Sequence, residues 1–123
     1  MPSRTKIYVV AVLLGRIAYG AGLAAVPERL SKRWLGPLAD PTSVALRALG
    51  VREAVLHALA LGSALRGGPV RPFLLASAVG DLADIVTTVG ARKGLPAWSA
   101  PATVLVAGAS AAESVYLATR ANR

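Results

Sequence analysis

The chain has 123 residues, of which 54% are hydrophobic and 16% are charged, and it contains no cysteine. A soluble domain usually carries about 25% charged residues, and the absence of cysteine excludes disulfides, a thiol nucleophile and an iron–sulfur cluster. The net charge is +8, but the basic residues gather at the ends of apolar stretches, where they meet lipid headgroups. We therefore expect a lipid bilayer, and no nucleic acid, as the partner of this charge.

Four apolar stretches follow one another along the chain, at residues 7–26, 42–65, 70–91 and 97–119. Each is long enough to cross a bilayer, which takes about 20 residues of helix. Lipid allows only helices and closed barrels to span it, and the period-2 alternation of barrel strands is absent. The sequence therefore predicts an all-α fold in which residues 1–123 form a single integral membrane domain, a four-transmembrane-helix bundle.

The first stretch begins after Arg4 and Lys6 and ends at Pro27. Basic residues before an apolar run also begin a signal peptide, but Arg16 interrupts this run. We therefore expect an uncleaved first span.

The segment 27–36, PERLSKRWLG, predicts a short interfacial helix between the first and second spans. Leu30 and Trp34 are four residues apart and share a helical face. Pro27 suits a first helical position, and Gly36 suits a C-terminal cap. We expect this helix to lie in the membrane interface with Trp34 as its anchor.

Glycine and proline predict the two remaining connections. Gly67, Gly68 and Pro69 form a turn between the second and third spans, and Gly94 and Pro96 lead into the fourth. Four spans place both termini on one side of the membrane. That side carries six basic residues against five on the other, so the positive-inside rule favours cytoplasmic termini of a multi-pass protein in a bacterial plasma membrane.

Every apolar stretch contains at least one ionisable residue near its middle. A charge near the centre of a bilayer costs about 2.5–3.5 kcal/mol on insertion scales. At about 1.5 Å of rise per residue, seven such residues fall in or near the middle third of an apolar core about 30 Å thick. They form two adjoining layers: Arg16, His57, Asp81 and Glu113, then Arg52, Glu53 and Asp84. The sequence therefore predicts a polar centre to which all four spans contribute.

The spacing of these residues suggests acid–base chemistry. Glu53 and His57 are four residues apart and Asp81 and Asp84 three apart, so each pair shares a helical face. Two carboxylates one turn apart cannot both ionise cheaply, which makes Asp81 and Asp84 the candidate acid and base. Arg16 or Arg52 would stabilise developing negative charge, and His57, beside Glu53, would relay a proton. With Glu113, four carboxylates face two guanidinium groups, so we expect protons to be held inside the membrane.

No cofactor or metal is expected, because the sequence holds one histidine and no phosphate loop, serine elbow or nucleotide fingerprint. The leading hypothesis is a membrane protein that binds, and transforms, an apolar small molecule by isomerisation, cyclisation or epoxide hydrolysis.

Two alternatives remain open. In the first, the protein is an accessory or assembly subunit of a membrane complex, and its charges are structural pairs that select how the helices dock. Small residues would then let the helices pack closely: Gly15, Ala18, Gly22, Gly80, Gly108 and Ala112. In the second, the protein is a proton-coupled transporter, which with four spans would require a homo-oligomer.

Three segments resemble a group of small four-helix membrane proteins of actinobacteria. They read GRIAYGAGLAAVPERLSKRWLG, ALRALGVREAVL and RPFLLASAVGDLADIVTT. The marks of the resemblance are Gly15-Arg16, Pro27, Trp34-Leu35-Gly36, Arg47, Gly50, Arg52-Glu53, Asp81 and Asp84. DoxX-type membrane proteins are similar in size and topology alone. The resemblance implies the fold and the membrane location, and no particular activity.

Overall fold

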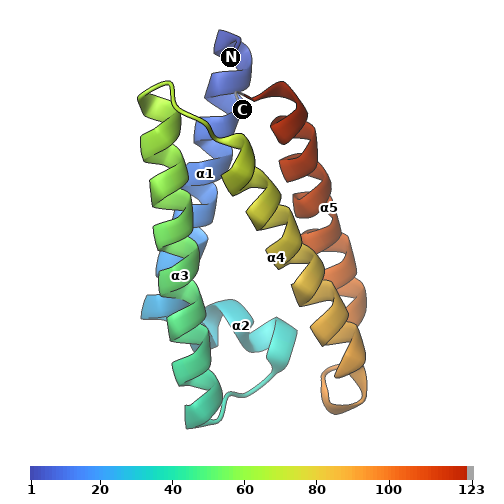
Figure 1. Ribbon diagram of the computed structural model, residues 1–123. Coiled ribbons are helices and arrows are strands. Elements are labelled where there is room, and N and C mark those ends of the chain that lie inside the picture. The colour runs from blue at the N-terminus through green and yellow to red at the C-terminus, as the bar shows by residue number, and fades with distance from the viewer. Residues whose placement is uncertain (122–123) are drawn as a thin grey trace.

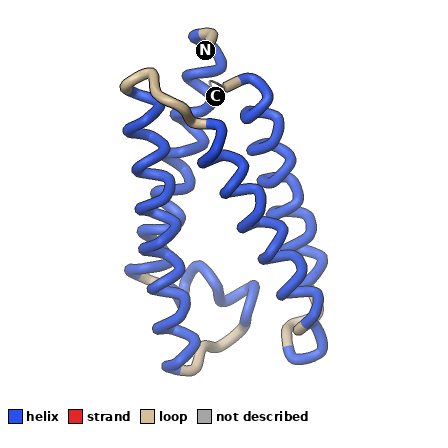
Figure 2. Tube along the Cα trace, viewed as in Figure 1, coloured by secondary structure: helices blue, strands red, loops and turns tan. Residues whose placement is uncertain are grey.

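The computed structural model describes residues 1–121, without the side chain of Arg33. The helices are α1 (Ser3–Ala25), α2 (Pro27–Leu35), α3 (Asp40–Leu65), α4 (Arg71–Gly90) and α5 (Ser99–Arg120), with a 3-10 turn, η1 (Arg92–Gly94), before α5 (Figure 1). Short loops make up the rest of the described residues, and no strand is present among them (Figure 2). The all-α class is thus confirmed for the described part of the chain.

The residues that interrupt the apolar stretches also end the helices. Pro27 is the first residue of α2, and Gly36 caps its C-terminus with a φ of 75°. Gly67, with a φ of 72°, turns the chain between α3 and α4. These positive φ values cost glycine nothing because it has no Cβ, whereas other residues rarely adopt them.

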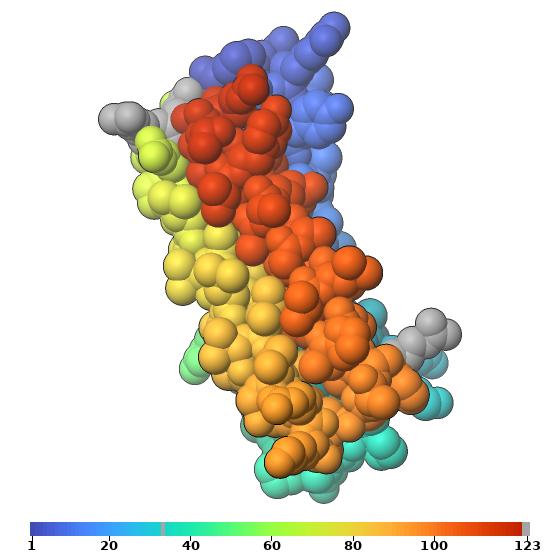
Figure 3. Space-filling model, turned by 90° about the vertical axis from the view of Figure 1, so that its right-hand side faces the viewer, coloured from blue at the N-terminus to red at the C-terminus, as the bar shows by residue number. Residues whose placement is uncertain are grey.

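The long helices form two pairs, α1 with α3 and α4 with α5, and within each pair the helices pack along one another. Contact between the pairs is sparser. Figure 3 shows α5 lying along α4 on one face of the molecule, with α1 beside its upper end. The two chain ends lie at the same end of the bundle (Figure 1).

The pair α1 and α3 meets at two glycines. A Cβ on Gly50 would lie 2.5 Å from the carbonyl oxygen of Gly20 and 2.6 Å from the nitrogen of Ala24, so the two backbones touch. By contrast, a Cβ on Gly15 or on Gly80 would meet no neighbour within 4 Å. The expectation that Gly15 and Gly80 permit close approach is therefore wrong, and Gly20 and Gly50 have that role.

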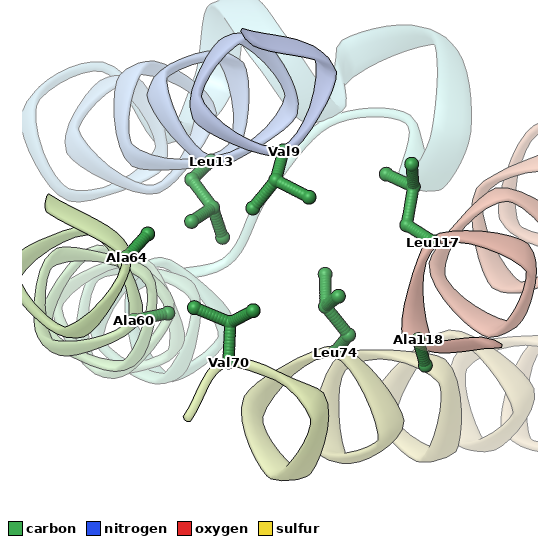
Figure 4. Packing of buried hydrophobic residues seen from close by; sticks show 8 residues of the cluster. All are labelled: Val9, Leu13, Ala60, Ala64, Val70, Leu74, Leu117 and Ala118. Carbon is green, nitrogen blue, oxygen red and sulfur yellow. The ribbon is translucent and has the colours of Figure 1, made fainter. Parts of the chain in front are cut away.

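An apolar cluster joins the two pairs near the chain ends. Its side chains come from all four long helices and from the residue just before α4, and they point towards a common centre (Figure 4). They are Val9, Leu13, Ala60, Ala64, Val70, Leu74, Leu117 and Ala118.

At the opposite end, α2 connects the pairs. The indole Nε1 of Trp34 donates to Oγ1 of Thr88 on α4 at 3.3 Å, and the hydroxyl of Ser99 on α5 donates to the Trp34 carbonyl. The Trp34 side chain is half-buried in this contact. Trp34 thus ties α2 to α4 at this end of the bundle, and its position in a headgroup layer stays a prediction.

Among the described residues, three helices are long and apolar enough to cross a membrane: α1, α4 and α5. Only 22%, 22% and 33% of their most apolar windows are fully buried, and large apolar side chains such as Ile7, Val86 and Leu105 are exposed on their surfaces. The α3 helix has 26 residues but does not meet the same criterion. It carries Arg47, Arg52, Glu53 and His57.

Candidate functional site

Arg16 on α1 joins three helices through its guanidinium group. Nη2 donates to Oδ2 of Asp81 on α4 at 2.9 Å, and Nη1 lies 3.4 Å from Oδ1. Nη2 also donates to the hydroxyl of Ser114 on α5 at 3.0 Å, and to the hydroxyl and carbonyl oxygens of Ser110. The Arg16 and Asp81 side chains are 15% and 13% exposed, so this charge-assisted pair is largely shielded from solvent. It connects α1 to the other helix pair at the middle of the bundle.

His57 on α3 makes a second connection, to α4. Its side chain is fully buried, with Nδ1 2.7 Å from the carbonyl oxygen of Glu53 and Nε2 2.5 Å from Oγ of Ser77. A carbonyl oxygen only accepts hydrogen bonds, so Nδ1 carries the hydrogen in this contact, and Nε2 shares a hydrogen bond with the Ser77 hydroxyl. The Glu53 carboxylate lies 3.5 Å from the same Nδ1.

The contacts of His57 resemble those of a hydrolase triad, in which a carboxylate lies beside one ring nitrogen and a serine hydroxyl beside the other. Here the carboxylate belongs to Glu53 and the hydroxyl to Ser77. However, Ser77 is 3% exposed and His57 is 0% exposed, so no substrate carbonyl reaches the hydroxyl. We therefore interpret the hydrogen bond between His57 and Ser77 as a packing contact that sets the rotation of α3 against α4.

Asp84 differs from its neighbour Asp81. It is half-buried, and among the described residues its carboxylate takes part in no hydrogen bond or ion pair. It lies within electrostatic range of Asp81, Glu53 and Arg16, and Tyr19 on α1 lies within range of the same carboxylates. Of these carboxylates, only that of Asp81 forms an ion pair with Arg16 among the described residues.

Two of the predicted centre residues are not in the centre. The side chains of Arg52 on α3 and Glu113 on α5 are exposed on the surface of the bundle, so the expectation that all seven groups converge is wrong for these two. Each residue turns a helix by about 100°. Arg52 precedes Glu53, and Glu113 precedes Ser114, by one residue, so each points away when its neighbour points inward.

Arg47, near the start of α3, was not assigned to the centre, and the structure places it at a helix end. Its Nη1 donates to the carbonyl oxygens of Ala24 and Ala25, at 2.6 and 3.2 Å. A guanidinium group at the C-terminus of α1 satisfies free carbonyls and complements the helix dipole.

Three serines complete the centre and are absent from the predicted set, because that set contains ionisable side chains alone. Ser77 precedes Asp81 by four residues, and Ser110 and Ser114 are four apart, so helical spacing places each set on one face. The signal for them in the sequence is a hydroxyl one helical turn from a charge or from another hydroxyl within an apolar stretch.

No group of three or more metal-ligating side chains occurs in residues 1–121. A shallow groove on the molecular surface is lined only by α1 residues between Ser3 and Leu14 and does not reach the centre.

Comparison of the chain with protein-family models, with curated proteins and with solved structures finds no match.

Proposed function

We propose that the chain is a multi-pass protein of the bacterial plasma membrane that binds an apolar small molecule beside Asp84 and Glu53. In this proposal the two carboxylates exchange protons with the bound molecule, in an isomerisation, a cyclisation or the hydrolysis of an epoxide. These reactions need a proton donor and a proton acceptor within reach of the bound molecule, and epoxide hydrolysis also consumes one water molecule.

The observation that carries this proposal is the difference between Asp81 and Asp84. Asp81 is held by Arg16, whereas Asp84 has no such partner although it is half-buried between helices. A structural charge has its partner already, but a reacting carboxyl group must leave room for the substrate. Asp84 is therefore assigned as the acid or base and Glu53 as its counterpart. Arg16 and Asp81 hold α1 and α4 at the distance that the site needs.

The position of the chain ends supports four membrane crossings. Both ends lie at one end of the bundle (Figure 1), which requires an even number of crossings if α1, α4 and α5 all span. The α3 helix packs along α1 and, with 26 residues, is about 39 Å long, enough for an apolar core of about 30 Å. We therefore include α3 as the fourth span, with both termini in the cytoplasm.

The test is mass spectrometry of small molecules that co-purify with the protein. The wild type is expected to retain one molecule in excess over bulk lipid, and Asp84→Asn to lose it. Asp40→Asn, the same change at the exposed start of α3, is the matched control and should retain it. The proposal fails if the wild type retains only bulk lipid, or if Asp84→Asn retains the same molecule as the control.

A second candidate is an accessory subunit whose charges are structural. The specific observation in its favour is that Arg16, Asp81, Ser110 and Ser114 link two helix pairs that otherwise meet sparsely. Lipid provides no hydrophobic force to sort helices, so polar contacts of this kind select the arrangement. This candidate predicts that Asp81→Asn lowers stability and that Asp84→Asn changes no ligand-dependent property.

A further inference from the structure

Arg52 lies on the outer face of α3, at the middle of the helix. It follows the first residue of α3 by 12 positions and precedes the last by 13. Its neighbours Val51, Val55 and Leu59 are also exposed, by 53%, 53% and 59%. Within the described part of the chain Arg52 has no hydrogen-bond or ion-pair partner. An arginine in this position would face hydrocarbon, which strongly disfavours a charge.

Glu113 repeats this situation on α5 with the opposite charge. It is exposed between Val106 and Tyr116, which are 69% and 57% exposed, and residues 1–121 supply no partner for its carboxylate. Seven positions separate it from Arg120, the last residue of α5. The same chain thus presents one unpaired cation and one unpaired anion on outward apolar faces.

The two helices that carry these charges lie on opposite sides of the bundle. Figure 4 shows α3 and α5 facing each other across the core, with α1 and α4 between them, and Figure 1 agrees. Arg52 and Glu113 therefore cannot pair within one copy. They also cannot both pair across a single two-fold interface, which uses the same patch of each copy.

We propose that copies of this chain associate head to tail in the membrane, with the α3 face around Arg52 packed against the α5 face around Glu113 of the next copy. Such a contact is heterologous, so copies add in one direction, as a closed ring or an open row, and Arg52 of each copy pairs with Glu113 of the next. Pairing removes two lipid-exposed charges per copy, and the surrounding valines and leucines supply the packing surface.

The depths of the two residues are compatible with this pair. From the ends nearest the chain termini, Arg52 lies about 20 Å deep and Glu113 about 10 Å. Extended arginine and glutamate side chains reach roughly 7 Å and 4 Å from bond lengths alone. The two side chains and the hydrogen bond between them span this difference in depth if the Arg52 side chain points towards the end of the bundle that carries the termini.

The test is a charge exchange, with the number of copies counted in lipid. The full-length chain is placed in vesicles of phosphatidylethanolamine and phosphatidylglycerol, and copies per complex are counted by single-molecule photobleaching. The wild type should form complexes of three or more copies. Arg52→Glu and Glu113→Arg should each raise the dissociation constant by at least about tenfold, and the double variant should restore the complex. Lys93→Glu, the same charge change in the exposed turn before α5, should have no effect.

Three results would overturn this proposal: a wild type that is monomeric in vesicles, single variants that associate as the wild type does, or a double variant that stays dissociated. The proposal depends on α3 and α5 lying in the bilayer, but not on the binding of a small molecule. A chain that does not insert into vesicles contradicts both this proposal and the membrane assignment. An inserted monomer contradicts self-association alone.

Discussion

Replacing Asp81 with asparagine removes the charge that balances Arg16 inside the bundle. In the wild type, the Asp81 carboxylate accepts from Arg16 at 2.9 Å and lies 3.4 Å from its other terminal nitrogen. The asparagine side chain keeps the size of the aspartate but offers one neutral oxygen. The guanidinium group would then be held only by that oxygen and by Ser110 and Ser114.

The expected loss of stability follows from the burial of this pair. Removing one partner of a buried ion pair costs about 3–5 kcal/mol. The Arg16 and Asp81 side chains keep 15% and 13% exposure, and two serine hydroxyls remain as acceptors. We therefore expect Asp81→Asn to lower the free energy of unfolding by about 2–3 kcal/mol, somewhat less than the full cost.

Asp84→Asn is the matched comparison, because it makes the same chemical change one helical turn away. It removes no hydrogen bond or ion pair among the described residues, so its effect should stay within about 0.5 kcal/mol. Both variants are unfolded reversibly in mixed detergent by increasing the fraction of dodecyl sulfate, and helix content is followed by circular dichroism. Equal effects of the two variants would refute the argument that Asp81 is structural and Asp84 is free.

Three further changes test the packing. Gly50→Ala should lower stability by about 1–3 kcal/mol, because its Cβ would overlap the α1 backbone, whereas Gly15→Ala, with open space around it, should not; equal unfolding midpoints would contradict this. Trp34→Phe should lower stability by about 1 kcal/mol, because it removes the hydrogen bond to Thr88. It should also speed hydrogen exchange in α2 but not in α3, and unchanged exchange in α2 would show that the contact is dispensable. Arg47→Ala should cost about 1 kcal/mol by uncapping α1, seen as earlier unfolding by dodecyl sulfate, and an unchanged midpoint would argue against the cap.

The positions of the helices could be predicted from local features of the sequence. Pro27, Gly36 and Gly67 end or begin helices because proline and glycine have backbone preferences that do not depend on distant residues. The length of each apolar stretch predicted helices, because length too is a local property of the sequence. The order of helices and the short helix α2 between the first two long ones therefore followed without knowledge of any contact.

Only part of the polar centre could be predicted from the sequence. Helical spacing correctly placed Glu53 and His57 on one face of α3, and the structure turns that face inward. Helical spacing could not tell which face of α3 turns inward. The helix carries apolar side chains on all of its faces, and lipid and a protein core accept the same side chains. Arg52 was therefore predicted to be as central as Glu53, although the two differ by about 100° around the axis.

The contacts of single serines and glycines also depend on the tertiary structure. Nothing in the sequence distinguishes Gly50 from Gly15, yet only Gly50 lies against another backbone. Likewise Ser114 accepts a hydrogen bond from Arg16 only because α5 packs beside α1 and α4 at the level of Arg16. Local chemistry determines which segments are helical and which charges lie deep in them. Which charge has a partner, which is left free and which faces outward depends on the rotation and crossing of the helices, and these arise only when all of them pack together.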